Sequence, residues 1–296
     1  MALDYHRLKS WPFTDVEQAY GWKDSALYAL GVGYGHDPLD ERQLRFVYED
    51  RMQAAPTMPV VLAGPGFWVK DPQSGVDWVR VLHGEQSLTL HRPLPVEGTV
   101  IGRTAVVGVI DKGREKGAIL HQRRTLRDKA SGELLATIEH LTFARGNGGF
   151  SELANNGPAG GDAPPPAKPA TPETAPDLVC DLPTMPQSAL LYRLCADLNP
   201  LHADPAVARA AGFERPILHG LASFGVAGHA ILRTCCDYDA SRLKSIGLRF
   251  SGPVFPGETI RTEIWHEAGG AAFRARVVER DKVVVSNGLF RHAGAA

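Results

Sequence analysis

The chain has 296 residues, of which 44% are apolar and 22% are charged, a composition typical of soluble globular proteins. Its 32 basic residues nearly balance its 33 acidic residues, which argues against a nucleic-acid or anionic-membrane partner. No apolar run approaches the roughly 20 residues needed to cross a bilayer. The first residues lack the apolar segment of a secretory signal, and the last three are not the peroxisomal tripeptide. We therefore expect a cytoplasmic protein without a membrane or nucleic-acid partner.

The four cysteines do not form a metal-binding pattern. They are Cys180, Cys195, Cys235 and Cys236, and no pair has the two-residue spacing of a zinc site. We expect reduced thiols packed as small apolar groups, and no metal.

The first half of the chain places helical patterns before strands. Apolar residues recur at helical spacing in 25–34 and 41–49. Alternating patterns bounded by turn residues then predict strands at 87–95, 99–111, 117–128 and 133–145.

A segment rich in proline and alanine follows, at 151–177. Seven of its 27 residues are proline and six are alanine, so little of it can be buried in a core. We expect an extended or mobile linker between a first half, 1–150, and a second half, 178–296.

The second half repeats the order of the first. Helical patterns occupy 186–196, 204–212 and 219–236, and strand patterns occupy 243–255, 259–268, 271–280 and 282–292. The phrases "RPLPVEGTVI" (92–101) and "SGPVFPGETI" (251–260) also place prolines and a glycine turn before a strand in each half. The economical interpretation is two copies of one α+β fold, with a long apolar helix covered by an antiparallel sheet.

The stretch "LCADLNPLHADPAVA" (194–208) carries the chemistry. Helical geometry should end near Ala196 because Pro200 disfavours it, and a new helix should begin after Asp204. Asp197, Asn199 and His202 therefore lie on a short connector, where side chains can converge without obeying helical spacing.

The next helix offers a hydrogen-bond donor. Residues 216–232 are almost uncharged, and the phrase "HGL" begins the helix at Gly220. The first N–H groups of a helix lack partners, and the helix dipole favours negative charge there. A carboxylate, an imidazole and a free amide suit the addition of water to an α,β-unsaturated thioester. His202 and Asp197 would exchange protons, Asn199 would orient water, and the Gly220 amide would hold the enolate oxygen.

The motif "YRLCADLNPLHADPAVA" resembles the signature of the (R)-specific enoyl-CoA hydratases, or hydratase 2, in the MaoC-like group. "GFERPILHGLASFG" resembles its oxyanion segment, and "SALYALGVGYG" and "LHGEQSLTLHRPLP" resemble the first half of its two-domain members. The resemblance implies a double hot-dog fold: two copies of a central helix wrapped by an antiparallel sheet. It also implies no cofactor beyond a coenzyme A thioester as substrate.

Carried onto this sequence, the resemblance makes Asp197 and His202 the acid–base pair. Asn199 would position water or the aspartate, and Gly220 would supply the oxyanion amide. The first half lacks the Asp-x-Asn-x-x-His motif, so it would be non-catalytic and would shape the acyl pocket for a medium, long or branched acyl chain. One departure is Cys195-Ala196, where members commonly have Ser-Gly.

Several other residues are candidates for contact with the substrate or for structural roles. Leu221 is expected at the acyl pocket, and Tyr192 is expected either to line that pocket or to pack on the helix. His219 is expected to line the site or support it. His83 and His229 are interpreted as structural. Basic residues that could meet the coenzyme A phosphates are Arg242, Lys244, Arg249 and the run 121–129.

Alternatives remain open. Asp197 and Asn199 could simply cap and turn the connector. The protein could be a hot-dog thioesterase, a non-catalytic acyl-thioester-binding subunit, or a hydratase of a branched unsaturated acid or thioester. A monomer and a homodimer are both compatible with the sequence, as are coenzyme A and acyl carrier protein as carriers.

Overall fold

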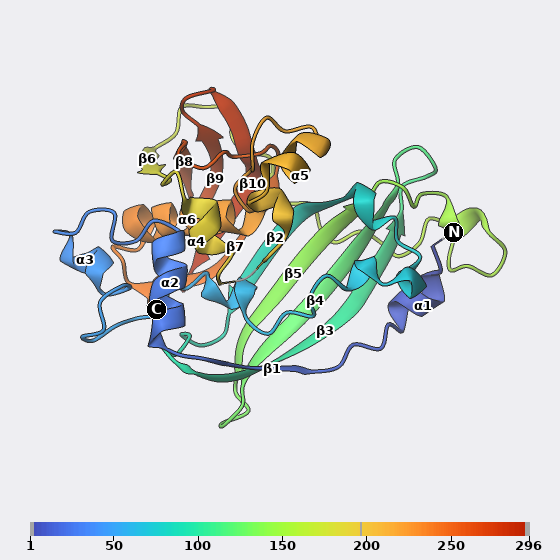
Figure 1. The fold of residues 1–296 in the computed structure, drawn as a ribbon, viewed down its shortest axis with the longest axis horizontal. Coiled ribbons are helices and arrows are strands. Elements are labelled where there is room, and N and C mark those ends of the chain that lie inside the picture. Colours follow the sequence, from blue (N-terminus) through green and yellow to red (C-terminus); the bar gives the residue numbers. More distant parts are fainter. Residues whose placement is uncertain (1–2, 196, 294–296) are drawn as a thin grey trace.

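Figure 1 presents the computed structural model of the chain, which describes residues 3–195 and 197–293. The strands are β1 (Val16–Tyr20), β2 (Val81–Leu90), β3 (Gly98–Asp111), β4 (Ala118–Asp128), β5 (Leu134–Ala144), β6 (Leu178–Pro183), β7 (Leu243–Phe250), β8 (Thr259–Glu267), β9 (Gly270–Val277) and β10 (Lys282–His292). The α-helices are α1 (Tyr5–Lys9), α2 (Trp22–Gly31), α3 (Glu41–Leu44), α4 (Ser188–Tyr192), α5 (Pro205–Ala210) and α6 (Gly220–Cys235). Short 3-10 helices are η1 (Met58–Val61), η2 (Trp68–Lys70), η3 (Pro72–Ser74), η4 (Trp78–Arg80), η5 (Phe150–Glu152), η6 (Pro200–His202) and η7 (Ala240–Arg242).

All ten strands form one antiparallel sheet in the order β1-β3-β4-β5-β2-β7-β10-β9-β8-β6. From one end of the sheet inward, the strands are β1, β3, β4, β5 and β2; from the other end inward, they are β6, β8, β9, β10 and β7. Strands β6 to β10 are therefore the counterparts of β1 to β5. The two halves join where β2 pairs with β7, for example at Ser87 and Gly247. The repeated topology confirms the prediction of two copies and of a double hot-dog fold.

Helix α6 occupies the centre of the main core. Residues 222–232 of the helix are all buried. Its glycines allow close approach to the first half, because an added Cβ would lie 2.4 Å from the side chain of Val32 at Gly225 and 2.4 Å from Thr57 at Gly228. The helix was predicted to be buried because many of its residues are small and almost none is charged. Two of these small residues, Gly225 and Gly228, also allow the two halves to pack closely.

In the part of the chain that the structure describes, the first half has no helix as long as α6. The helix predicted over 25–34 is present as α2, the ten residues Trp22–Gly31, with half of its residues buried. The helix predicted over 41–49 ends at Leu44. Residues 58–80 instead form the short helices η1 to η4. Pro59, Pro65 and Pro72 interrupt this segment, and each proline removes a backbone donor that a continuous helix would need.

Other element boundaries also differ from expectation. The edge strands β1 and β6 were not predicted, because each has only five or six residues with a mixed burial pattern. The helix expected over 186–196 covers only Ser188–Tyr192, and the strand expected over 243–255 ends at Phe250, before Pro253.

The segment 151–177 runs outside the ten strands and the α-helices, and polar contacts anchor it to both halves. The Asp162 carboxylate accepts hydrogen bonds from the Val109 N–H (2.8 Å), Lys9 (3.0 Å) and Tyr5 (2.8 Å). Near its other end, the Trp265 indole donates to the Thr174 carbonyl (3.0 Å). Side-chain contacts thus fix a segment that has few apolar groups to bury.

No helix in the described ranges combines the length and the apolar character required to span a membrane.

Candidate active site

The connector after α4 folds as two successive turns. The Asp197 carboxylate accepts a hydrogen bond from the Asn199 N–H (2.9 Å), and the Asn199 side-chain oxygen accepts one from the Leu201 N–H (3.0 Å). Helix η6 then places His202 one turn further along. The capping role considered from the sequence is therefore real, and the Asn199 backbone orients Asp197 while its side-chain oxygen shapes the turn.

One hydrogen bond sets the orientation of His202. Its Nδ1 lies 2.9 Å from the Ile217 carbonyl, and since a carbonyl only accepts, Nδ1 carries the proton. The lone pair therefore resides on Nε2. The residue is only 8% exposed, and burial lowers the pKa of His202 below its ordinary value. His202 is neutral at neutral pH and can accept a proton at Nε2.

His219 is held against His202. Its Nε2 donates to the Asp197 carbonyl (3.0 Å), which leaves the lone pair on Nδ1, a buried atom without a partner in the described ranges. The two imidazole rings stack with centroids 3.7 Å apart. Burial, followed by the neighbouring His202, lowers the pKa of His219 to about 4. A second neutral ring thus covers one face of the proton acceptor.

The structure brings Asp197, His202 and His219 together. One carboxylate or ring atom from each lies within 4.8 Å of the others, and Asp197 is exposed while both histidines are buried. A carboxylate and a basic nitrogen at this separation can act on a common water or substrate atom. Ala196, where the motif departs from the hydratase signature, lies outside the described residues.

The start of α6 completes the cluster. His219 is the N-cap but makes no capping hydrogen bond with its side chain. Within the described ranges, no protein group accepts a hydrogen bond from the N–H of Gly220 or Leu221. An added Cβ at Gly220 would point toward Phe250, 3.5 Å away, without a clash. The glycine therefore leaves open a path along which a ligand oxygen can reach a free helix-start amide.

The same cluster could hold a divalent cation, because two imidazoles and a carboxylate are suitable ligands. These donors are also the groups that the proton chemistry would use. The sequence-based expectation of no metal stays a prediction.

The comparisons with known proteins identify the family. A model described as "MaoC like domain" matches residues 167–288, and one described as "MFE-2 hydratase 2 N-terminal domain" matches residues 19–146. Enoyl-CoA hydratase ChsH3 of Mycobacterium tuberculosis is 37% identical, over 95% of this chain and 92% of its own length. Peroxisomal enoyl-CoA hydratase 2 of Arabidopsis thaliana is 38% identical, over 92% of this chain and 90% of its own length.

The chain belongs to the MaoC-like hydratase 2 family. A solved MaoC-like dehydratase from Phytophthora capsici superposes with a TM-score of 0.84 and 34% identity, covering 99% of this chain and 100% of that one. The family resemblance read from the motif is therefore confirmed, and it extends over both halves of the fold.

The structure separates two predicted substrate-binding residues from the hydratase-like cluster. Arg242 ends η7 and Lys244 is the second residue of β7, both beyond the carboxyl end of α6, whereas Gly220 starts that helix. A helix of 16 residues spans about 24 Å. By contrast, Leu221 adjoins Gly220, and the Tyr192 ring centroid lies 5.1 Å from that of His219. Proximity therefore supports Tyr192 and Leu221 as lining residues. The contact predicted between the coenzyme A phosphates and Arg242 or Lys244 stays a prediction, because the pantetheine arm separates those phosphates from the thioester.

Sequence reasoning missed a contribution from the first half. The His83 ring contacts Phe250 edge-on at 4.7 Å and stacks on His140 at 3.8 Å. Burial lowers the pKa of His83 to about 4, although the nearby charge of Asp197 acts in the opposite direction. His83 thus lies within electrostatic reach of the cluster. The only local signal was the phrase "HG" at 83–84, which echoes the "HG" at 219–220.

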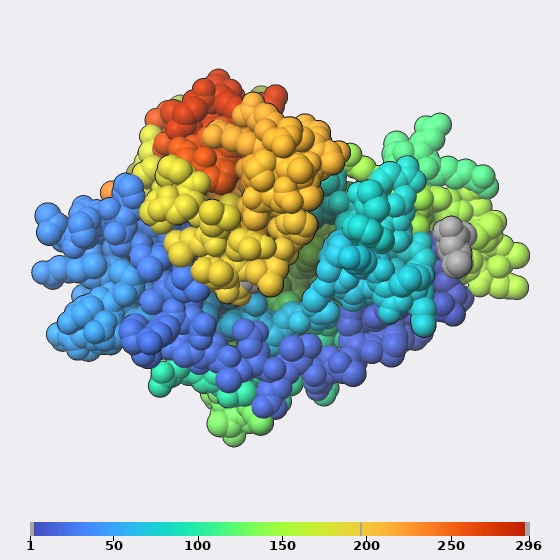
Figure 2. Space-filling view, viewed as in Figure 1, coloured from blue at the N-terminus to red at the C-terminus, as the bar shows by residue number. Residues whose placement is uncertain are grey.

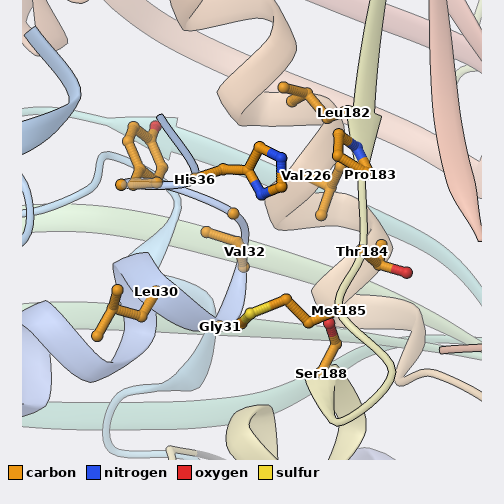
Figure 3. Close-up of a pocket in the computed structure, with 13 residues that line it drawn as sticks. Leu30, Gly31, Val32, His36, Leu182, Pro183, Thr184, Met185, Ser188 and Val226 are labelled. Carbon is orange, nitrogen blue, oxygen red and sulfur yellow. The ribbon is translucent and has the colours of Figure 1, made fainter. Parts of the chain in front are cut away.

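A cleft gives access to the region between the two halves. Figure 2 shows a hollow between the gold lobe, which contains α5, and the cyan lobe near residues 70–80, with green strands at its floor. Separately, a small cavity of about 70 Å³ lies between residues 30–36 and 182–188 against Val226 (Figure 3). Another, of about 350 Å³, lies at the carboxyl end of α6, between Leu90, Leu94 and Ala240. Neither cavity is lined by the Asp197–His202–His219 cluster.

Proposed function

We propose that this protein catalyses the reversible hydration of trans-2-enoyl-CoA to (R)-3-hydroxyacyl-CoA. One observation carries the proposal: Asp197 and the basic His202 approach within 4.8 Å beside the free amide of Gly220. The two relatives described above are both named enoyl-CoA hydratases, which supports a hydro-lyase.

In the proposed reaction, His202 acts as the base. Its Nε2 takes a proton from water while the water oxygen forms a bond to C3 of the enoyl group. The electron pair of the double bond moves onto the thioester oxygen, where the Gly220 N–H stabilises the enolate. Protonated His202 then passes the proton taken from water to the Asp197 carboxylate, and the resulting carboxylic acid delivers it to C2, which restores the carboxylate and the neutral His202.

The remaining residues orient this pair. The Asn199 backbone holds the Asp197 carboxylate, and the Ile217 carbonyl holds the His202 ring in the tautomer that leaves Nε2 free. Proton transfer of this kind requires no redox cofactor and no metal. A cytoplasmic location and a homodimer remain predictions, and one of the relatives is named as peroxisomal.

The test follows the loss of the enoyl thioester absorbance of crotonyl-CoA and of longer enoyl-CoAs, with chiral analysis of the product. We expect hydration to the (R)-3-hydroxy product. Release of free thiol from saturated acyl-CoA, without hydration of any enoyl-CoA, would favour the thioesterase alternative. Binding of enoyl-CoA without turnover would favour the non-catalytic alternative.

A further inference from the structure

A band of polar side chains crosses the inner face of the first-half sheet. On β4, Gln122 and Arg124 lie between Leu120 and Leu126, which belong to two separate apolar clusters. Side chains two apart on a strand share a face, so all four point to the inner side. The register places Thr104 beside Arg124, and His140 beside both Gln122 and Gln86. The polar band is defined here as Thr104, Gln122, Arg124, His140 and Gln86.

At the matching position of the second half, the described residues place one buried polar side chain, Thr262, on β8 beside Ala275, and no charged one on β9. The counterpart of β4 in this half is β9, which contributes Phe273, Ala275 and Val277 to the same apolar cluster as α6. The first half lacks a helix of that length, and its inner face is polar across several strands. The short helix η1 (Met58–Val61) covers part of this face, and its Pro59 and Val60 carbonyls accept hydrogen bonds from Arg124. The remaining polar groups of the face are suited to a polar ligand.

Three atoms in or beside the polar band are buried without a hydrogen-bond partner among the described residues. They are Arg124 Nε, Thr104 Oγ1 and His83 Nε2. Buried polar atoms are nearly always paired in proteins, so their grouping at one place points to a missing partner.

The charge of Arg124 is also unmatched. Its Nη2 donates to two neutral carbonyls, those of Pro59 (3.3 Å) and Val60 (2.8 Å). Within the described ranges, no carboxylate forms an ion pair with it, whereas the adjacent Arg123 pairs with Glu139 at 2.8 Å on the outer face. Burial lowers the pKa of Arg124 to about 10, so it stays charged at neutral pH. The Arg124 side chain is partly buried, with its Nε atom fully so. A cation in this position without an anion is unfavourable, and an anionic ligand would offset that cost.

The polar band leads toward the catalytic cluster. His140 stacks on His83, which contacts Phe250 beside Gly220. Arg124 lies two strands from β2, a lateral distance of about 10 Å at the usual strand spacing. The green strands at the floor of the cleft in Figure 2 belong to the sheet region that carries the polar band.

We propose that Arg124 and Thr104 bind a carboxylate at the far end of the substrate's acyl group. The preferred substrates would then be ω-carboxylated enoyl thioesters, the mono-thioesters of unsaturated dicarboxylic acids. This inference rests on the proposed hydratase function, because it assigns the acyl group of that reaction. A phosphate of coenzyme A fits less well, since the pantetheine arm separates it from the thioester and Arg124 lies only two strands from β2, which carries His83.

The first measurement uses binding alone, so it does not depend on catalysis. Adipyl-CoA, a saturated carboxylated thioester, is compared with hexanoyl-CoA, which has the same chain length without the carboxylate. We expect adipyl-CoA to bind the wild-type protein about 10- to 100-fold more tightly, the range for one hydrogen-bonded charge. Equal affinities would overturn the proposal without any variant. If no enoyl-CoA is hydrated but this preference is observed, the proposed reaction fails and the binding site stands.

The second measurement uses variants. Arg124→Met should abolish the preference for adipyl-CoA while leaving hexanoyl-CoA binding within about twofold, and Arg124→Lys should restore part of it. Thr104→Val, which removes only a hydroxyl, should weaken adipyl-CoA binding selectively. The matched control is Arg123→Met, on the same strand but facing outward, and it should change neither affinity.

Two outcomes would contradict the assignment. If Arg124→Met weakens both ligands equally but leaves binding of acyl pantetheine thioesters unchanged, Arg124 contacts a phosphate of coenzyme A. If Arg124→Met lowers only thermal stability and keeps the adipyl-CoA preference, Arg124 merely holds the carbonyls of Pro59 and Val60.

Discussion

The imidazole rings of His202 and His219 stack at 3.7 Å with an angle of 28° between their planes. The His202 ring donates an N–H to the Ile217 carbonyl, and the His219 ring donates one to the Asp197 carbonyl. Each ring therefore keeps a lone pair on its other nitrogen. Two adjacent rings cannot both carry charge without strong repulsion, and burial disfavours charge on either one. The stack therefore keeps the base of the proposed reaction neutral.

The pH dependence of the rate should follow this arrangement. A base acts only when unprotonated, and the pKa of His202 lies below its ordinary value of 6.5. We expect kcat/KM for crotonyl-CoA to stay level as the pH falls to about 6.5 and to decrease only at lower pH. Stopped-flow rates across pH 4 to 8 check this, with folding monitored by circular dichroism. A decrease that begins above pH 7 would contradict a buried neutral base.

Substitutions at two glycines of α6 should distinguish the proposed role of the helix start in catalysis from the role of the helix in core packing. At Gly220, an added Cβ would contact Phe250 at 3.5 Å, an ordinary distance, so Gly220→Ala should leave thermal stability nearly unchanged. The methyl group would enter the path of the thioester oxygen, and kcat/KM should fall by about 10- to 100-fold.

The matched control for Gly220→Ala is Gly228→Ala, where the Cβ would lie 2.4 Å from Thr57. This variant should lose about 1–3 kcal/mol of stability because it overpacks the core. Its rate per folded molecule should be retained. If Gly220→Ala is as active as wild type, the helix-start amide does not hold the substrate oxygen as proposed.

Zinc should inhibit the enzyme. Asp197, His202 and His219 offer three ligand atoms within 4.8 Å, and bound Zn²⁺ would occupy the atoms that exchange protons. We expect full activity after dialysis against EDTA and reversible inhibition by added Zn²⁺, with weaker inhibition of His219→Gln. Loss of activity in EDTA that Zn²⁺ restores would show instead that the cluster acts through a metal.

The repeated halves and the connector that carries Asp197, Asn199 and His202 could be predicted from the sequence because their signals are local. Pro200 and Asp204 fix the ends of the connector, and "HGL" marks the start of α6. Asp197 and His202 lie within six positions on this short connector, so their side chains could be expected to lie close together. The long apolar run 219–236 likewise predicted α6 to within one residue at each end.

Features that depend on distant parts of the chain could not be predicted. His83 and Asp197 are 114 positions apart, and the β2–β7 pairing, together with the Phe250 contact, brings His83 to the cluster. Arg242 and Lys244 were predicted to contact the coenzyme A phosphates because they follow α6, and their place at the far end of that helix from Gly220 could not be judged before the helix was known. The unmatched charge of Arg124 became visible only once the strand register was known, because on the sequence it is one of several basic residues in 121–129.

The central claim is that Asp197 and His202 exchange protons with a shared water. The most direct measurement is the hydration rate of crotonyl-CoA by Asp197→Asn and by His202→Gln, with Asp239→Asn, at the far end of α6, as the matched control. Each site variant should fold like wild type and lose about 10²- to 10⁴-fold in kcat, while the control keeps the wild-type rate. Near-wild-type kcat in either folded site variant would contradict the account.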